Sequence, residues 1–150
     1  MFDTFSGLPV HALVVHAVVV LVPLMSLVTI AVAVRAAWRP LARYVAAANV
    51  LLLLVAFVAR QSGLAFQERL SKFGANDAIT THANYGKVLP LFVLGLVVAA
   101  VVVMLSDTRP QLAVAGIVLA VVAGIAALGW TVVTGDSGAR AVWEETIKNT

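Results

Sequence analysis

The sequence predicts an all-α integral membrane protein: a four-helix bundle with short loops and a short C-terminal helix at the membrane interface. Of its 150 residues, 62% are hydrophobic and 11% are charged, whereas soluble domains have about 45–50% apolar and about 25% charged residues. The mean hydropathy is +1.03. Four runs reach the roughly 20 apolar residues that a transmembrane helix needs. No repeat or shift in composition divides the chain, so we expect a single domain over residues 1–150.

The four spans are expected at residues 10–34, 43–66, 82–105 and 112–133. The stretch from Gly7 to Leu24, which leads into the first span, is apolar apart from two histidines, and the second span becomes more polar toward its end. Thr80 or Thr81 would cap the third span, because threonine side chains accept bonds from free backbone amides there. The fourth carries glycine or alanine at three- or four-residue steps, a pattern typical of close helix packing. The short linkers make neighbouring helices antiparallel.

The C-terminal segment is expected to form a separate short helix. Gly135 would end the fourth span, because glycine commonly follows the last turn of a helix. Asp136 or Ser137 would then cap a new amphipathic helix over residues 139–147. Trp143 would rest in the membrane interface, where tryptophan is enriched.

Basic residues predict how the bundle is oriented. Arg35, Arg39 and Arg43 cluster without an acid around the first short linker, and the third linker contains Arg109 and Asp107. Positively charged linkers favour the cytoplasmic side of a membrane. We therefore expect both termini to be extracytoplasmic.

Composition argues against several functions. The absence of cysteine excludes disulfides and Cys-ligated clusters. The net charge of +3 suits anionic lipid head groups, and no basic stripe indicates nucleic acid. The sequence shows no nucleophile paired with a base and no phosphate loop, and GDSG lacks the Gly-x-Ser-x-Gly spacing of a nucleophile elbow. An enzyme is therefore the less favoured class.

All three histidines are expected at one membrane face. We count about 20 residues outward from each cytoplasmic helix end, at about 1.5 Å per residue. His16 then lies at the outer edge of the hydrocarbon, and His11 and His82 lie roughly 6 Å further out. Arg60 lies about 4–5 Å inside that edge, and Asp136 follows the fourth span at a comparable height. These residues form the candidate site.

Each candidate also has an ordinary structural interpretation. A five-residue step turns about 140° around a helix, so His11 and His16 cannot both face one point. The deeper His16 is expected to face the bundle interior, whereas His11 could be an interfacial histidine bonded to a carbonyl. His82 could be a surface residue at a helix start, and Arg60 could extend to lipid phosphate. On depth, His16 and His82 are expected to matter more than His11.

The stretches of the first, third and fourth helices that contain these candidate residues resemble, taken together, a family of small bacterial membrane proteins known as domain of unknown function 2231. The shared pattern is Leu-Pro and two histidines in the first helix, a histidine and a glycine in the third, and Gly-x-x-Gly with an aromatic in the fourth. In this sequence the matching residues are Leu8, Pro9, His11, His16, His82, Gly86, Gly135, Gly138 and Trp143. Asp136 stands where many relatives have histidine, and Ala12 where they have proline. The resemblance implies a redox or metal-related role in the bacterial cytoplasmic (inner) membrane.

Two classes of function stay open. The first is a haem or metal site at the extracytoplasmic face, serving electron transfer or a respiratory assembly. Haem b would be bound by His16 or His11 together with His82, and Arg60 would meet a propionate. A Zn, Cu or Fe ion would instead use His11, His16, His82 and Asp136. The alternative is a cofactor-free accessory subunit of a larger membrane complex. Expected partners are the lipid bilayer, a membrane or respiratory complex, or a second copy of the chain, and not nucleic acid.

Overall fold

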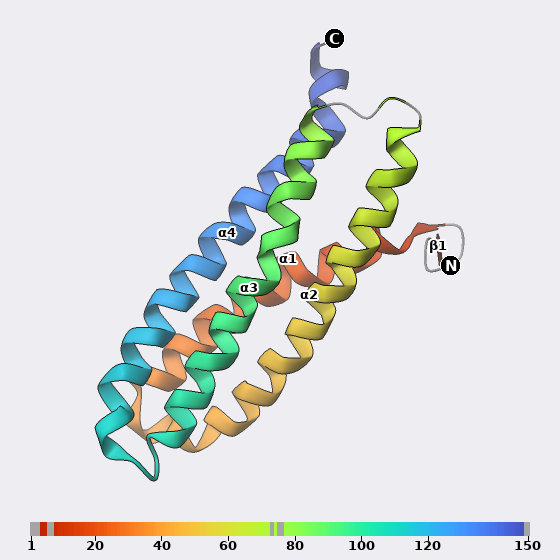
Figure 1. Ribbon diagram of the computed structural model, residues 1–150. Coiled ribbons are helices and arrows are strands. Elements are labelled where there is room, and N and C mark those ends of the chain that lie inside the picture. Colours follow the sequence, from red (N-terminus) through yellow and green to blue (C-terminus); the bar gives the residue numbers. More distant parts are fainter. Residues whose placement is uncertain (1–3, 6–7, 73, 75–76, 149–150) are drawn as a thin grey trace.

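The computed structural model describes residues 4–5, 8–72, 74 and 77–148. In this part of the chain, four long helices form an antiparallel bundle (Figure 1). They are α1 (Val10–Val34), α2 (Ala42–Ser71), α3 (Asp77–Leu105) and α4 (Ala113–Lys148). Each is long and apolar enough to cross a membrane. The predicted all-α membrane bundle is confirmed.

The short elements lie at the two ends of the bundle. Two-residue strands β1 (Thr4–Phe5) and β2 (Leu8–Pro9) pair antiparallel before α1. The 3₁₀ helices η1 (Ala36–Leu41) and η2 (Pro110–Leu112) connect α1 to α2 and α3 to α4. We call the end with η1 and η2 the linker end, and the end where α1 and α3 begin and α2 and α4 end the terminal end (Figure 1).

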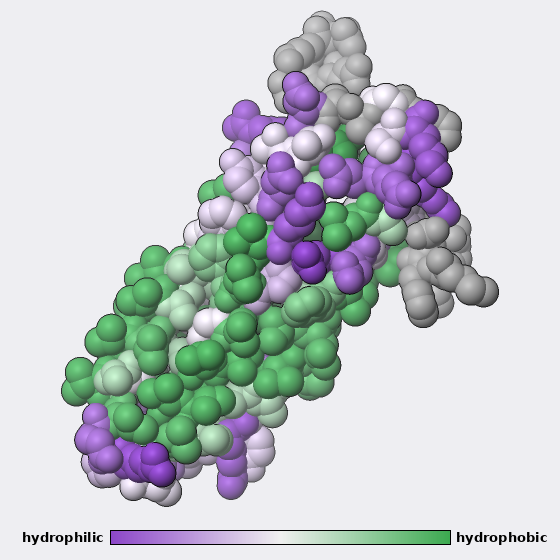
Figure 2. Space-filling model, in the orientation of Figure 1, coloured by the Kyte–Doolittle hydropathy of each residue, from purple (hydrophilic) through white to green (hydrophobic). Residues whose placement is uncertain are grey.

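The core consists of small and branched apolar side chains from all four helices. One cluster surrounds Val22 and Leu96 toward the terminal end, and the other surrounds Val103 toward the linker end. A Cβ added to Gly124 would lie 2.6 Å from Ile30, so α1 and α4 approach closely there. Large apolar side chains outside the core form a hydrophobic band between more polar ends (Figure 2), as a lipid-facing surface requires.

One polar cluster is buried within the bundle. The fully buried Asn49 on α2 donates from Nδ2 to Thr29 Oγ1 on α1 at 3.0 Å and to Leu96 O on α3 at 3.3 Å. These bonds link three helices where no water is available to replace them.

Two predicted helix boundaries are wrong. Helix α3 begins at Asp77, so Thr80 and Thr81 lie inside it and do not cap it. Helix α4 continues without interruption through Gly135 to Lys148, so the separate C-terminal helix does not form. Glycine permits a helix end but does not impose one. Here the hydroxyl of Ser137 donates to Thr134 O within α4 at 2.7 Å instead of capping a new helix.

Candidate functional site

His11 lies in the first turn of α1 and extends to α2. Its Nδ1 is 3.1 Å from Ala59 O. A carbonyl oxygen can only accept, so Nδ1 carries the proton and Nε2 is left as a lone-pair donor for a ligand. The ring also stacks against Phe66 of α2, with centroids 6.4 Å apart. These two contacts with α2 therefore fix the tautomer and the orientation of the His11 ring.

His82 is held in the same way on the other side. From α3, its Nδ1 lies 3.1 Å from Thr134 O and 3.1 Å from Ser137 Oγ, both on α4. Because the Ser137 hydroxyl already donates to Thr134 O, both oxygens act as acceptors for the Nδ1 proton. The Nε2 lone pair of His82 is again left for a ligand.

Two glycines allow the rings to lie directly against the backbones of neighbouring helices. A Cβ added at Gly63 of α2 would be 2.9 Å from Cε1 of His11, and one added at Gly138 of α4 would be 2.9 Å from Cε1 of His82. Real Cβ atoms do not approach other atoms so closely. A larger residue at either position would therefore require the ring to shift.

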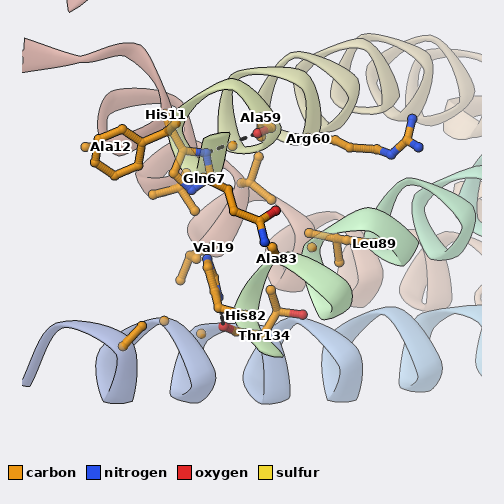
Figure 3. Close-up of a pocket in the computed structure, with 18 of the residues that line it drawn as sticks. His11, Ala12, Val19, Ala59, Arg60, Gln67, His82, Ala83, Leu89 and Thr134 are labelled. Atoms are coloured by element: carbon orange, nitrogen blue, oxygen red, sulfur yellow. Dashed lines mark hydrogen bonds between the residues drawn. The ribbon is translucent and has the colours of Figure 1, made fainter. Parts of the chain in front are cut away.

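The two histidines face a common space. Their ring centroids are 6.2 Å apart and their planes make an angle of 65°. Figure 3 shows His11 beside α2 and His82 beside Thr134 of α4, on opposite sides of that space. Because metal–nitrogen bonds are about 2 Å long, two histidine rings at this separation could both bind one metal atom.

A cavity of about 670 Å³ adjoins the pair at the terminal end. This volume lies within the range of about 300–1,000 Å³ that is usual for small-molecule sites. All four helices line the cavity, mostly with aliphatic side chains and glycines. Its polar lining residues are His11, His16, Arg60, Gln67, His82, Lys87, Thr131 and Thr134. No aspartate or glutamate of the described chain lines it.

Arg60 is half-buried beside this cavity. Its side chain points away from the two histidines (Figure 3). Its Nε is buried and has no hydrogen-bond partner among the described residues. Lys87 on α3 is more exposed, and its Nζ donates to Asn84 Oδ1 at 3.2 Å.

His16 does not face the bundle interior, so that expectation is wrong. It borders the cavity, but its ring is exposed and its Nδ1 is bonded to Ala12 O in its own helix. The buried positions of α1 that follow His16 are Val18 and Val22, and the turn of about 140° from His11 carries His16 away from the pair. Depth along the helix therefore gave a misleading ranking of the two α1 histidines.

Asp136 lies on another face of α4. It is exposed and pairs with Arg140 at 2.8 Å, and it does not line the cavity. Thr134 faces the cavity. Asp136 is two residues further along, a step that turns the helix by about 200°, so its side chain points to the other side of α4. Within the described residues, no group of three or more His, Asp or Glu side chains could hold a metal ion. The four-ligand set of His11, His16, His82 and Asp136 is thus not assembled.

Sequence reasoning missed the residues that hold the histidines in place. Gly63 is one of them, although it lies on the second span about one turn beyond Arg60, close to the expected outer edge of the hydrocarbon. A glycine at such a level of a membrane helix often marks a close approach. Ser137 and the carbonyls of Ala59 and Thr134 could not be found, because the phase of each helix relative to its neighbours depends on tertiary packing.

Comparison with known families adds one match. The family model described as "Predicted membrane protein (DUF2231)" covers residues 7–150, which is nearly the whole chain. No curated protein and no solved structure matches the sequence.

Proposed function

The chain belongs to the DUF2231 family of predicted membrane proteins, and from this premise we propose that it binds haem b between His11 and His82 and serves electron transfer in the membrane. The observation that supports this proposal most is that the two histidines make the same kind of hydrogen bond and lie close together. Each bonds through Nδ1 to a carbonyl of a neighbouring helix, and their rings are 6.2 Å apart. These bonds leave Nε2 of each ring available, and the proposal is that both would bind one metal atom.

The number of protein ligands favours haem over a bare ion. A structural zinc site takes four protein ligands, and no group of three or more ligands is present in the described part of the chain. A haem would need only one or two ligands from the protein. The pair formed by His11 and His82 meets that need.

The surroundings suit a bound redox group. A hydrogen bond from Nδ1 to a carbonyl orients a ligating histidine and raises its basicity. The aliphatic lining and the stacked ring of Phe66 leave His11 only partly exposed, and limited access of water tunes the potential of a bound metal. Haem would supply reversible one-electron chemistry, and the protein would hold it at a fixed depth for a respiratory partner.

The orientation of the bundle is part of the proposal. Arg35 lies over the ring of Trp38 at 4.6 Å, and Arg43 lies over that of Tyr44 at 4.7 Å. Together with Arg39 they make the linker end strongly basic without an acid nearby in sequence. Such a cluster favours the cytoplasmic side, which would put the histidine pair at the extracytoplasmic face of the inner membrane.

The test is haem content in purified variants. The protein is purified in detergent from cells supplied with a haem precursor, and the Soret absorption and the haem-to-protein ratio are measured. We expect His11→Ala and His82→Ala each to lose the haem, and His16→Ala to keep it, since His16 is bonded within its own helix. Circular dichroism checks that each variant is folded.

Two results would contradict the proposal. Full haem occupancy in both His11→Ala and His82→Ala would show that the pair is not the ligand set. A wild-type protein without haem, both as purified and after titration with haem, would favour a cofactor-free accessory subunit. Elemental analysis of the same samples would then reveal any Zn, Cu or Fe.

A further inference from the structure

Two cationic side chains, those of Arg60 and Lys87, line the cavity, and none of the acidic side chains that the structure describes lines it with them. Asp136 is paired with Arg140, away from the cavity. Ionisable side chains in membrane spans usually pair with one another or mark a ligand path. The missing negative charge is therefore expected on whatever occupies the cavity.

Arg60 has the stronger requirement for such a partner. Its Nε is buried and unsatisfied among the described residues, and a buried donor without an acceptor is costly. The guanidinium fork matches the two oxygens of a carboxylate or the oxygens of a phosphate. Its side chain points away from the histidine pair, so it could bind an anionic group on the periphery of a ligand whose centre lies between the histidines.

The charges are also distributed asymmetrically. Arg60 is on α2 and Lys87 is on α3, whereas α1 and α4 contribute no charged Lys, Arg, Asp or Glu side chain to the lining. The wall made by α1 and α4 consists of aliphatic residues, glycines, histidines and threonines. A ligand with one acidic edge and one apolar edge would therefore bind in a single orientation.

We propose that Arg60, assisted by Lys87, binds an oxyanion carried by the cavity's largely apolar ligand, with that acidic edge turned toward α2 and α3. This inference rests on the proposed haem site in one respect: for haem b the oxyanion is a propionate. The same chemistry could come from the phosphate of an anionic lipid. The experiment therefore needs an arm for each source.

The first arm compares haem b with haem dimethyl ester, in which both propionates are neutralised and the ring is unchanged. Dissociation constants are measured by Soret titration of haem-free protein. We expect wild type to prefer haem b by about tenfold or more, the equivalent of one charge-assisted hydrogen bond. Arg60→Gln should abolish most of this preference and Lys87→Gln part of it. Lys72→Gln is the matched control, because Lys72 directly follows α2, the helix of Arg60, but does not line the cavity.

Equal affinity of wild type for the two porphyrins would overturn the inference, as would a preference that Arg60→Gln leaves unchanged. Either result would leave the histidine pair as ligands, so it is distinguishable from failure of the haem proposal. If neither porphyrin binds, the second arm applies. Native mass spectrometry then measures phosphatidylglycerol retained from micelles that also contain phosphatidylcholine. Retention that depends on Arg60 would support the oxyanion site with a lipid phosphate as its source, and equal retention in Arg60→Gln would overturn it.

Discussion

His11 and His82 depend on contacts that a histidine cannot make by itself. Each ring reaches a carbonyl on a neighbouring helix only because a glycine there leaves room for it. The site is therefore made of two histidine–glycine contacts, one between α1 and α2 and one between α3 and α4. A change at either glycine should affect ligand binding without touching a ligating atom.

Gly63→Ala and Gly138→Ala should each reduce haem affinity by about tenfold or more, the cost of losing one hydrogen bond to a carbonyl and the ligand orientation it fixes. The added methyl carbon would lie 2.9 Å from the histidine ring in each case. Replacing a mid-helix glycine by alanine favours the helix itself by about 0.5–1 kcal/mol, so helicity should not fall. Soret titration and circular dichroism measure the two effects separately.

Gly86→Ala and Gly135→Ala are the matched controls for this prediction. Both glycines line the same cavity, but an added Cβ at either has no atom within 4 Å. Their haem affinity should remain close to that of wild type. Equal losses at all four positions would show that the cavity as a whole, and not contact with the histidines, causes the effect.

Among the helices, α4 shows most clearly where local sequence and tertiary structure disagree. Gly135, Asp136 and Ser137 together match the pattern of a helix end followed by a new cap, yet α4 is continuous through them. Thr134 Oγ1 donates to Trp130 O at 2.8 Å, and Arg140 pairs with Asp136 one turn away. These intrahelical contacts support continuity, and continuity brings Thr134 and Ser137 into register with His82.

Gly135→Pro distinguishes a continuous helix from two helices. Proline is tolerated in the first turn of a helix, so a break at this point would make the variant nearly neutral. Inside a continuous helix, proline removes a hydrogen bond and clashes with the carbonyl of Thr131, at a cost of about 3 kcal/mol or more. We expect a clear loss of thermal stability and of haem binding relative to Gly135→Ala, measured by thermal unfolding in detergent and by Soret titration. A variant as stable as Gly135→Ala would contradict the continuous α4.

Asn49 links α1, α2 and α3 through its amide nitrogen. Asn49→Ala should lower the free energy of unfolding by about 0.6 kcal/mol and by at most about 1.7 kcal/mol, the range measured for polar contacts between membrane helices. Its Oδ1 has no partner among the described residues, which argues for the lower value. Leu54→Ala on the same helix, where the side chain is 57% exposed, should change stability less. Unfolding in mixed detergent micelles measures both variants. A larger loss for Leu54→Ala would contradict the interhelical role of Asn49.

At the scale of the whole molecule, the sequence predicted what depends on hydrophobicity and length. Four apolar runs predicted four helices, and counting residues from the helix ends correctly brought His11 and His82 to one end of the bundle. The count could not predict how each helix is rotated about its axis. It therefore ranked His16 above His11 and included Asp136 in the site. Rotation depends on packing between helices, such as the glycine contacts of the two histidines, and a single sequence encodes these contacts only indirectly.

The direction in which the whole bundle crosses the membrane is the last prediction. The absence of cysteine allows single cysteines to be introduced and labelled in intact cells with a maleimide that cannot cross the membrane. Ala37→Cys reports on the linker end, where Ala37 is exposed in η1, and Lys72→Cys reports on the terminal end, where Lys72 is exposed after α2. Because Arg35, Arg39 and Arg43 surround the first linker, we expect Lys72→Cys to be labelled in intact cells and Ala37→Cys only after permeabilisation. The reverse result would put the histidine pair on the cytoplasmic side. It would then require a cytoplasmic electron-transfer partner, while the geometry of the pair would be unchanged.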